Sequence, residues 1–372
     1  MFHQNNIVLI GNSLVEQSKS IKYLKKRVIN IDSFNDIDLV GENYLNSDSF
    51  GYVNDNVIEI LKKLDLKRED TLIIVSSEYG KNKNYHSLLE SYGKIIGNSY
   101  ITISNLQNHR NLINTLDKNN ITHPKKFFTK ESIEEPVLIK NSYLSGGFGI
   151  KKYKNGLEIN NEYEYFEQYV KGNSYSVLFV ANEEKKIEII GINKIFNKKT
   201  AYSAFSFSGA CSNISFSDIK IKYLKKIINI FVIEYGLVGF NGIDFIISDD
   251  IYFLEINPRL TQTCFLYDEY FSGGYLLAHI NSILNGELPS CKKKRDDVIF
   301  FENLFAKESF VFNQDLEKFD FVTNIPKSNT FIDVGEPICT ISSRSNNEKK
   351  AKNLLLNNIS LIKKIFKNLE II

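Results

Sequence analysis

Two neighbouring apolar segments carry polar side chains that could bind a metal ion and an anion. Residues 242–259 read GIDFIISDDIYFLEINPR, and their two apolar runs flank Asp249–Asp250, which predicts a β-hairpin. Asp244 lies on the first run. Alternate positions of the second run hold a carboxylate, an amide and a guanidinium: Glu255, Asn257 and Arg259. Strand residues two apart share a face, so these three side chains are expected to point the same way.

Pairing of the two strands is expected to bring Asp244 beside Glu255. Ionised groups inside apolar runs are costly unless they are paired or bound to a metal. Oxygen ligands suit Mg²⁺ that is also held by substrate phosphates, and arginine suits planar recognition of phosphate or carboxylate. The alternative is a solvated carboxylate, which is our interpretation for Asp249 and Asp250. The pattern favours a metal site beside a fixed cation.

A glycine-rich loop is the second candidate site. Residues 137–149 read VLIKNSYLSGGFG, in which an apolar strand delivers Lys140 to a loop with several glycines. Glycines let the backbone approach an anion, and lysine supplies a point charge for phosphate. The loop lacks the GxxxxGK[ST] pattern of a Walker A motif. Phosphate binding and a simple glycine turn therefore remain equally open from this segment alone.

The acidic hairpin resembles the metal-binding hairpin of ATP-grasp enzymes, which carry an acid on one strand and Glu-x-Asn-x-Arg on the next. Residues 166–176, FEQYVKGNSYS, resemble the family's hinge, where an acid–x–aromatic–aliphatic segment meets adenine. The matches follow the family's order from Leu106 to Leu288: helix cation, strand lysine, glycine loop, hinge and acidic hairpin. On this basis the chain is identified as a member of the ATP-grasp superfamily.

The resemblance implies roles for individual residues. Mg²⁺ (or Mn²⁺) would be held by Asp244, Glu255 and Asn257, and the catalytic cations facing the transferred phosphate would be Arg259 and Lys194. ATP would contact eleven further residues: Arg110, Lys140, Ser145, Gly146, Gly147, Gly149, Glu167, Gln168, Tyr169, Val170 and Ser174.

Three of these assignments depart from the family pattern or have a structural alternative. Arg110 replaces the lysine that usually begins the helix before the lid, and an exposed helix arginine is the alternative. Ser174 stands where many relatives have an acid for the ribose hydroxyls. Lys194 could be an edge-strand charge. In the hinge, Glu167 is expected at the exocyclic amine of adenine, with backbone groups of residues 168–170 along the adenine edge.

The surrounding elements predict an α/β protein, with an α+β ligase core. Strands and helices alternate over the first hundred residues, which indicates a parallel sheet. Strands are expected at 7–11, 28–32, 71–77 and 99–104, and helices at 56–64, 86–96, 106–120, 218–236, 273–289 and 349–368. We expect an ATP-grasp fold in three parts: a Rossmann-like pre-ATP-grasp domain (1–104), an ATP-grasp domain (105–290) with a lid at about 122–170, and a small β/α region completing it (291–372).

Composition excludes several classes of protein. The 372 residues carry a net charge of +2, so the basic run Lys292–Arg295 is interpreted as solvated linker and no nucleic-acid partner is expected. No apolar run is long enough to span a membrane, and the N-terminus lacks signal-peptide features. The cysteines form no CxxC pair and are expected to be free thiols in the cytoplasm: Cys211, Cys264, Cys291 and Cys339.

The resemblance implies an ATP-dependent carboxylate–amine ligase that passes through an acyl phosphate and releases ADP and phosphate. The segments NPRLTQT, FSFSGACSN and IPKSNTFIDVGEPICTIS resemble a branch with tyramine–glutamate ligases and proteins of tetrahydromethanopterin-linked C1 metabolism. The partners would be a small carboxylate and an amine, and a homodimer is allowed.

The alternatives are a biotin-carboxylase-like enzyme that activates bicarbonate and a non-catalytic ATP-binding module. An NAD-dependent dehydrogenase is disfavoured because the loop after Gly11 lacks the full GxGxxG fingerprint.

Overall fold

The computed structural model describes most of the chain. The described residues are 2–22, 24–46, 56–76, 83–128, 133, 136–141, 144, 146–154, 159–160, 163–290, 296–366 and 371. Ser145, Cys291 and the run Lys292–Arg295 lie outside them.

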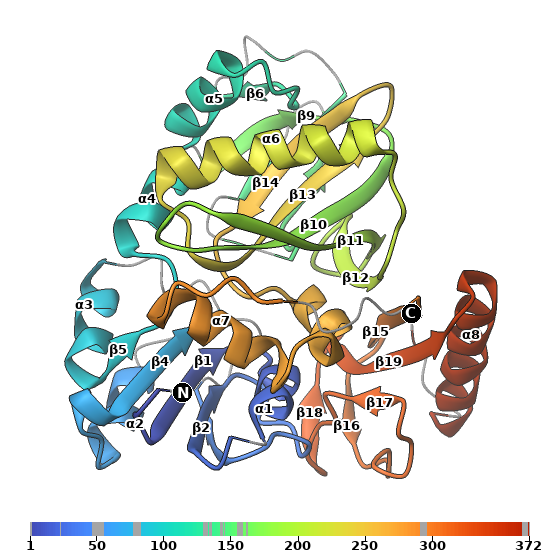
Figure 1. Ribbon diagram of the computed structural model, residues 1–372. Coiled ribbons are helices and arrows are strands. Elements are labelled where there is room, and N and C mark those ends of the chain that lie inside the picture. The colour runs from blue at the N-terminus through green and yellow to red at the C-terminus, as the bar shows by residue number, and fades with distance from the viewer. Residues whose placement is uncertain are drawn as a thin grey trace.

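The N-terminal part is a parallel sheet covered by helices on both faces (Figure 1). Its strand order is β3-β2-β1-β4-β5: β1 (Asn6–Gly11), β2 (Arg27–Asp32), β3 (Glu42–Leu45), β4 (Thr71–Val75) and β5 (Lys94–Ile95). The helical segments are α1 (Val15–Ile21), α2 (Asn56–Lys63), η1 (Arg68–Asp70) and α3 (Lys83–Tyr92). Because β1 is buried on both faces, its sequence is continuously apolar. The predicted Rossmann-like sheet is confirmed.

An eight-stranded antiparallel sheet, in the order β14-β13-β10-β11-β12-β15-β19-β17, forms the centre of the molecule. Its first five strands are β10 (Asn173–Ala181), β11 (Ile187–Lys198), β12 (Ser206–Cys211), β13 (Gly239–Ile247) and β14 (Ile251–Asn257). Helix α6 (Asp218–Tyr235) packs on one face (Figure 1). Helix α7 (Gly274–Leu284) and the 3₁₀ segment η4 (Gln262–Tyr270) lie on the other face, between this sheet and the parallel sheet.

A separate small sheet carries the lysine and the hinge that the sequence singled out. Its order is β6-β9-β7-β8: β6 (Lys126–Phe127), β7 (Val137–Asn141), β8 (Lys151–Lys152) and β9 (Glu164–Gln168). Phe127, Val137, Ile139 and Phe166 give it a core of its own. We call this the lid sheet.

The C-terminal strands continue the central sheet. They are β15 (Val298–Phe305), β17 (Val322–Thr323) and β19 (Pro337–Ser345), and helix α8 (Glu348–Ile365) packs on β15 and β19. A hairpin-like pair, β16 (Phe310–Phe312) and β18 (Thr330–Ile332), stands beside them.

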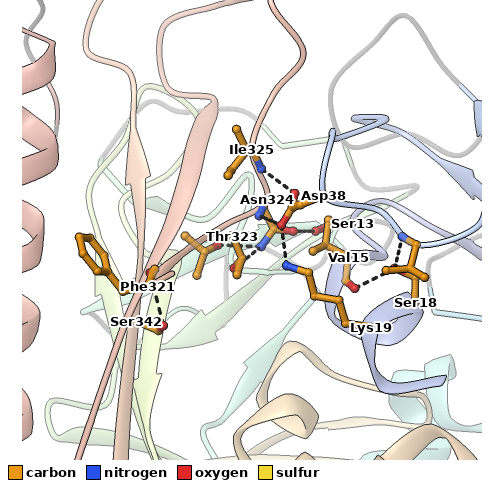
Figure 2. A network of polar contacts seen from close by, with 12 residues as sticks. Ser13, Val15, Ser18, Lys19, Asp38, Phe321, Thr323, Asn324, Ile325 and Ser342 are labelled. Carbon is orange, nitrogen blue, oxygen red and sulfur yellow. Dashed lines mark hydrogen bonds and ion pairs between the residues drawn. The ribbon is translucent and has the colours of Figure 1, made fainter. Parts of the chain in front are cut away.

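A polar network ties this C-terminal part to the Rossmann-like sheet (Figure 2). The Asp38 carboxylate accepts the backbone N–H groups of Asn324 and Ile325 at 3.1 and 3.0 Å and pairs with Lys19 at 2.7 Å. The Ser13 hydroxyl donates to the Asn324 amide oxygen at 2.6 Å. The first and last parts of the chain are thereby fixed against each other.

Three predicted elements between residues 86 and 120 differ from the structure. The strand expected at 99–104 is wrong, because Ser99 caps helix α4 (Tyr100–Gln107) by accepting the N–H of Thr102. The single helix expected at 106–120 is divided by Asn108, whose side chain caps α5 (His109–Lys118). The helix expected at 86–96 ends at Tyr92, and the chain then forms β5.

Candidate active site

The acidic hairpin is confirmed as β13 and β14. Asp244 and Glu255 are direct partners across the two strands, and Gly242 pairs with Asn257. The Asn257 amide donates to Asp244 Oδ2 at 3.0 Å, and Arg259 donates to Asn257 Oδ1 at 3.4 Å. Alternation along one strand and pairing with its neighbour therefore gather two carboxylates, an amide and a guanidinium on one face.

Burial and like charge dominate the electrostatics of the hairpin. Burial raises the pKa of Asp244 well above its usual value, and the adjoining Glu255 carboxylate raises it further, against the lowering effects of Asn257 and Arg259. Burial lowers the pKa of Arg259, while Glu255 and Asp244 oppose that change. Two carboxylates held together in this way favour a bound cation.

On the lid sheet, a single carboxylate lies between two lysines. Lys140 Nζ lies 2.6 Å from Glu167 Oε1, and Lys126 Nζ lies 3.5 Å from Glu167 Oε2. The three side chains are 13, 5 and 2 % exposed for Lys140, Lys126 and Glu167. Burial lowers the pKa of Lys126 below its usual value. For Lys140, the effect of burial is outweighed by Glu167, Tyr165 and Glu255, so its pKa is raised. Lys140 lines the same cavity as Glu255, and Lys126 lines a second cavity that Glu255 also reaches, so the lid cations lie beside the acidic hairpin.

The glycine loop is held against the central sheet. Phe207 N–H donates to Gly146 O at 2.9 Å, and Gly149 N–H donates to Tyr202 O at 3.3 Å. Gly147 has φ +75°, and a Cβ there would lie 2.1 Å from Phe205 O. A side chain at this position is therefore excluded by both backbone conformation and close approach.

The hinge segment leaves part of its backbone open. Gln168 N–H donates to Lys125 O and Tyr169 N–H to Pro136 O, both at 2.8 Å. The N–H of Val170, which lines the main cavity, has no hydrogen-bond partner in the described part of the chain. The predicted adenine contacts therefore depend on Val170 and on hinge carbonyl groups, since two of the N–H groups are already used.

A cavity of about 2150 Å³ brings the predicted residues together. Its wall includes fourteen of the sixteen: Lys140, Gly146, Gly147, Gly149, Glu167, Gln168, Tyr169, Val170, Ser174, Lys194, Asp244, Glu255, Asn257 and Arg259. Ser145 lies outside the described residues, and Arg110 is exposed on α5 and does not line the cavity. Residues from the Rossmann-like sheet and from the C-terminal part complete the wall.

The structure identifies a cation that the sequence did not. Lys126 stands behind Glu167 and lines a smaller cavity of about 150 Å³ together with Glu255 and Arg259. On α5, His109 and Leu112 line this cavity. The His109 ring lies 4.3 Å from that of Tyr165, while the neighbouring Arg110 is exposed and does not line the cavity. Because Phe127 packs in the core of the lid sheet, strand alternation places Lys126 on the opposite face, where the smaller cavity lies. The sequence could not show its partner Glu167, which lies about forty residues further along the chain.

The hairpin fits a hard divalent cation. Within the described ranges, no three His, Cys, Asp or Glu side chains form a metal-binding group. The hairpin offers two carboxylates and one amide oxygen. Mg²⁺ typically takes one or two protein carboxylates and completes its shell with substrate phosphates and water, so this donor set suits it.

Asp32, the acid at the end of β2, is not available to bind the ribose of a dinucleotide. The Asp32 carboxylate there is fully buried and accepts three backbone N–H groups, from Leu14, Phe34 and Asn35. Burial raises its pKa to about 6.

None of the described helices is long and apolar enough to cross a membrane.

The parallel sheet, the lid sheet and the acidic hairpin on the central sheet are together the elements of an ATP-grasp fold. Residues 106–263 match the ATP-grasp domain family. The chain belongs to the ATP-grasp superfamily.

Its relatives include ligases. An uncharacterized protein of Methanocaldococcus jannaschii is 30% identical over 313 residues, which cover 79% of this chain and 74% of that protein. A tyramine–L-glutamate ligase of Methanocaldococcus fervens is 29% identical over 143 residues, 38% of this chain and 46% of that one.

Two solved structures share the fold. Carboxyaminoimidazole ribonucleotide synthase from Aspergillus clavatus, complexed with ATP, gives a TM-score of 0.73 at 14% identity and covers 98% of this chain and 100% of that one. The biotin carboxylase domain of Hydrogenobacter thermophilus 2-oxoglutarate carboxylase, in complex with MgADP, gives 0.69 at 11% identity, with 100% and 91% covered.

Proposed function

We propose that this protein is an ATP-dependent ligase that joins a carboxylate to an amine through an acyl phosphate. The observation that carries the proposal is that the acidic hairpin, the glycine loop and Lys140 line one cavity, while Lys126, on the other side of Glu167, lines a second, smaller cavity together with Glu255 and Arg259. The partial match to a tyramine–L-glutamate ligase supports the bond type.

In the proposed reaction, a substrate carboxylate attacks the γ-phosphate of ATP, which gives an acyl phosphate and ADP. The amine then attacks the acyl carbon, and phosphate and a proton leave. Lys140 would contact the ATP phosphates and Arg259 the transferred phosphate, both as fixed positive charges. Glu167 orients Lys140 through their 2.6 Å ion pair.

Asp244, Glu255 and Asn257 would hold Mg²⁺ or Mn²⁺. When bound, the metal would neutralise the charge that develops on the transferring phosphate. The glycine loop would cover the phosphates with its backbone N–H groups, and its bonds to the 202–207 segment would exclude water from the acyl phosphate. The protein contributes mainly positioning and preorganised charge.

The test is a panel of carboxylates and amines incubated with the full chain, ATP and Mg²⁺. ADP and phosphate are measured, and products are sought by mass spectrometry as acid plus amine minus water. Hydroxylamine replaces the amine in a parallel set, because it traps an acyl phosphate as a hydroxamate. ADP release that needs bicarbonate and no amine would reject the proposal in favour of a biotin-carboxylase-like activity.

The matched variants are Glu255→Gln and Asp249→Asn on the same hairpin. Glu255→Gln is expected to lower turnover by about three orders of magnitude, since one metal ligand is lost. Because Glu255 is exposed in the absence of ligands, unfolding free energy should change by less than about 0.5 kcal/mol. Asp249→Asn, in the exposed turn, should have normal turnover, and normal turnover in Glu255→Gln would remove the metal assignment.

A further inference from the structure

The cavity extends beyond the nucleotide end to the carboxyl ends of the parallel strands. In the order β3-β2-β1-β4-β5, the direction of the chain through the sheet reverses between β1 and β4. Open parallel sheets bind ligands in the crevice at this switch point. Ser13, which follows β1, and Ser76, which follows β4, both line the cavity, and Asn324 and Lys327 face them from the C-terminal part.

Asp36 is a buried carboxylate in this part of the wall. It lies in the loop after β2, is 3% exposed and lines the cavity. Its carboxylate forms no hydrogen bond or ion pair with any residue that the structure describes. The other two acids of the same loop are satisfied: Asp32 by three backbone N–H groups, and Asp38 by Lys19 and the backbone of Asn324 and Ile325.

The surrounding charge is unbalanced. Burial raises the pKa of Asp36 well above its usual value, Asp32 and Asp38 raise it further, and Lys19 and Lys327 lower it. Lys19 is already paired with Asp38, and Lys327 is exposed. Glu16 also lines this end of the cavity. An acidic end therefore faces the basic end formed by Lys140, Lys194 and Arg259.

The neighbours of Asp36 indicate the kind of cation that fits. Neutral donors and acceptors line the same end of the cavity: Asn12, Ser13, Gln17, Ser33 and Ser76. A carboxylate without a partner, set among hydroxyls and amides, matches an ammonium group, which has three donors. Within the described part of the chain, no three His, Cys, Asp or Glu side chains gather here as a metal-binding group, and this end of the cavity lies away from the hairpin residues assigned to the metal.

We propose that Asp36 binds the ammonium group by which the amine substrate is recognised, so that the amine occupies the crevice of the Rossmann-like sheet. This inference rests on the proposed ligase function and assigns the amine to one end of the cavity. A substrate amine is then selected over a neutral compound of the same shape, because the neutral compound would leave Asp36 without a partner.

The test measures binding to the full chain by calorimetry without ATP, so it needs no turnover. The probes are matched pairs of an amine and a neutral alcohol: 2-phenylethylamine and 2-phenylethanol, and 1,4-diaminobutane and 1,4-butanediol. At least one amine is expected to bind more tightly than its neutral partner, and Asp36→Asn should weaken it by about tenfold or more. The control is Asp315→Asn, which removes an exposed acid that does not line the cavity and should leave amine binding unchanged.

Two further measurements separate the explanations. Asp36→Asn should retain Mg·ATP binding, which would show that the variant is folded. Lys327→Met should bind the amine at least as tightly as the wild type does, because it removes a lysine that competes with the amine for Asp36. The inference is overturned if no probe amine binds, if the neutral partners bind equally well, or if Asp36→Asn or Lys327→Met gives the opposite result.

The inference and the ligase proposal can fail separately. Asp36-dependent amine binding in a protein that releases no ADP would reject only the ligase. Amine-dependent ADP release with the same KM for the amine in Asp36→Asn would reject only the inference.

Discussion

Lys140 Nζ and Glu167 Oε1 form a 2.6 Å ion pair inside the lid sheet, and Lys126 approaches the other oxygen of the same carboxylate. One negative charge is therefore shared by two ammonium groups, and the cluster retains a net positive charge. Because Lys140 is held by its partner, a phosphate would meet a cation that is already oriented.

Replacing Lys140 with alanine should raise the KM for ATP and lower kcat, each by about tenfold or more, because a phosphate charge is lost. Glu167 keeps Lys126 as a partner, so the lid sheet should remain folded. Lys151→Ala is the control, since this lysine belongs to the same sheet, is 60% exposed and does not line the cavity. The KM for ATP and kcat are measured from the rate of ADP release in both variants. Unchanged values in Lys140→Ala would reject the phosphate contact.

Glu167→Gln should destabilise the fold by about 3–5 kcal/mol, because it leaves two buried ammonium groups without a carboxylate. Urea unfolding followed by circular dichroism measures the change. The double variant Lys126→Met/Glu167→Gln should recover part of the loss, since only one cation then lacks a partner. If the double variant is less stable than Glu167→Gln, the shared-carboxylate explanation is wrong.

Gly147→Ala should weaken ATP binding by about tenfold, because the added methyl group meets Phe205 O and the φ of +75° is unfavourable for alanine. Gly97→Ala is a matched control, since a Cβ there meets nothing within 4 Å. Calorimetric titration with Mg·ATP gives both affinities. Equal affinities would show that the position of this loop does not determine nucleotide binding.

Acid should destabilise the protein through His279. Its ring is 2% exposed, accepts Phe240 N–H at 3.0 Å, and burial lowers its pKa to about 4. Between pH 6.5 and 4 the unfolded chain takes up a proton that the folded protein does not, so the unfolding free energy falls as pH falls. From pH 7.5 to 5 this contribution decreases by about 2 kcal/mol.

Comparison with His279→Gln isolates this effect from the other titrating groups. The wild type should be more stable at pH 7.5, and its advantage should shrink by that amount at pH 5. Urea unfolding at the two pH values is the measurement. Parallel pH dependence in the two proteins would mean that His279 does not titrate differently on folding.

Prediction from sequence succeeded where the information was local. The period-two pattern of Asp244, Glu255 and Asn257 determines both the face and the hairpin pairing, so the sequence alone is enough to predict the cluster. The helix stop at Gly236 was also readable, because this residue takes the left-handed conformation that glycine favours.

It failed where a contact depended on distant residues or on the exact rotation of a helix. Asn108 caps α5, and this sets the rotation that turns His109 toward Tyr165 and Arg110 toward solvent. The link between Lys126 and Glu167 joins two strands of the lid sheet that the sequence does not show to be neighbours.

The Asp38 contact with Asn324 joins residues 286 positions apart. Closing so large a loop costs more chain entropy than forming the hairpin of β13 and β14, so long-range contacts of this kind form late in folding. Asn324 and Lys327 also line the cavity, so the wall beside the Rossmann-like sheet would be completed only after the C-terminal strands have folded, later than the face carried by β13 and β14.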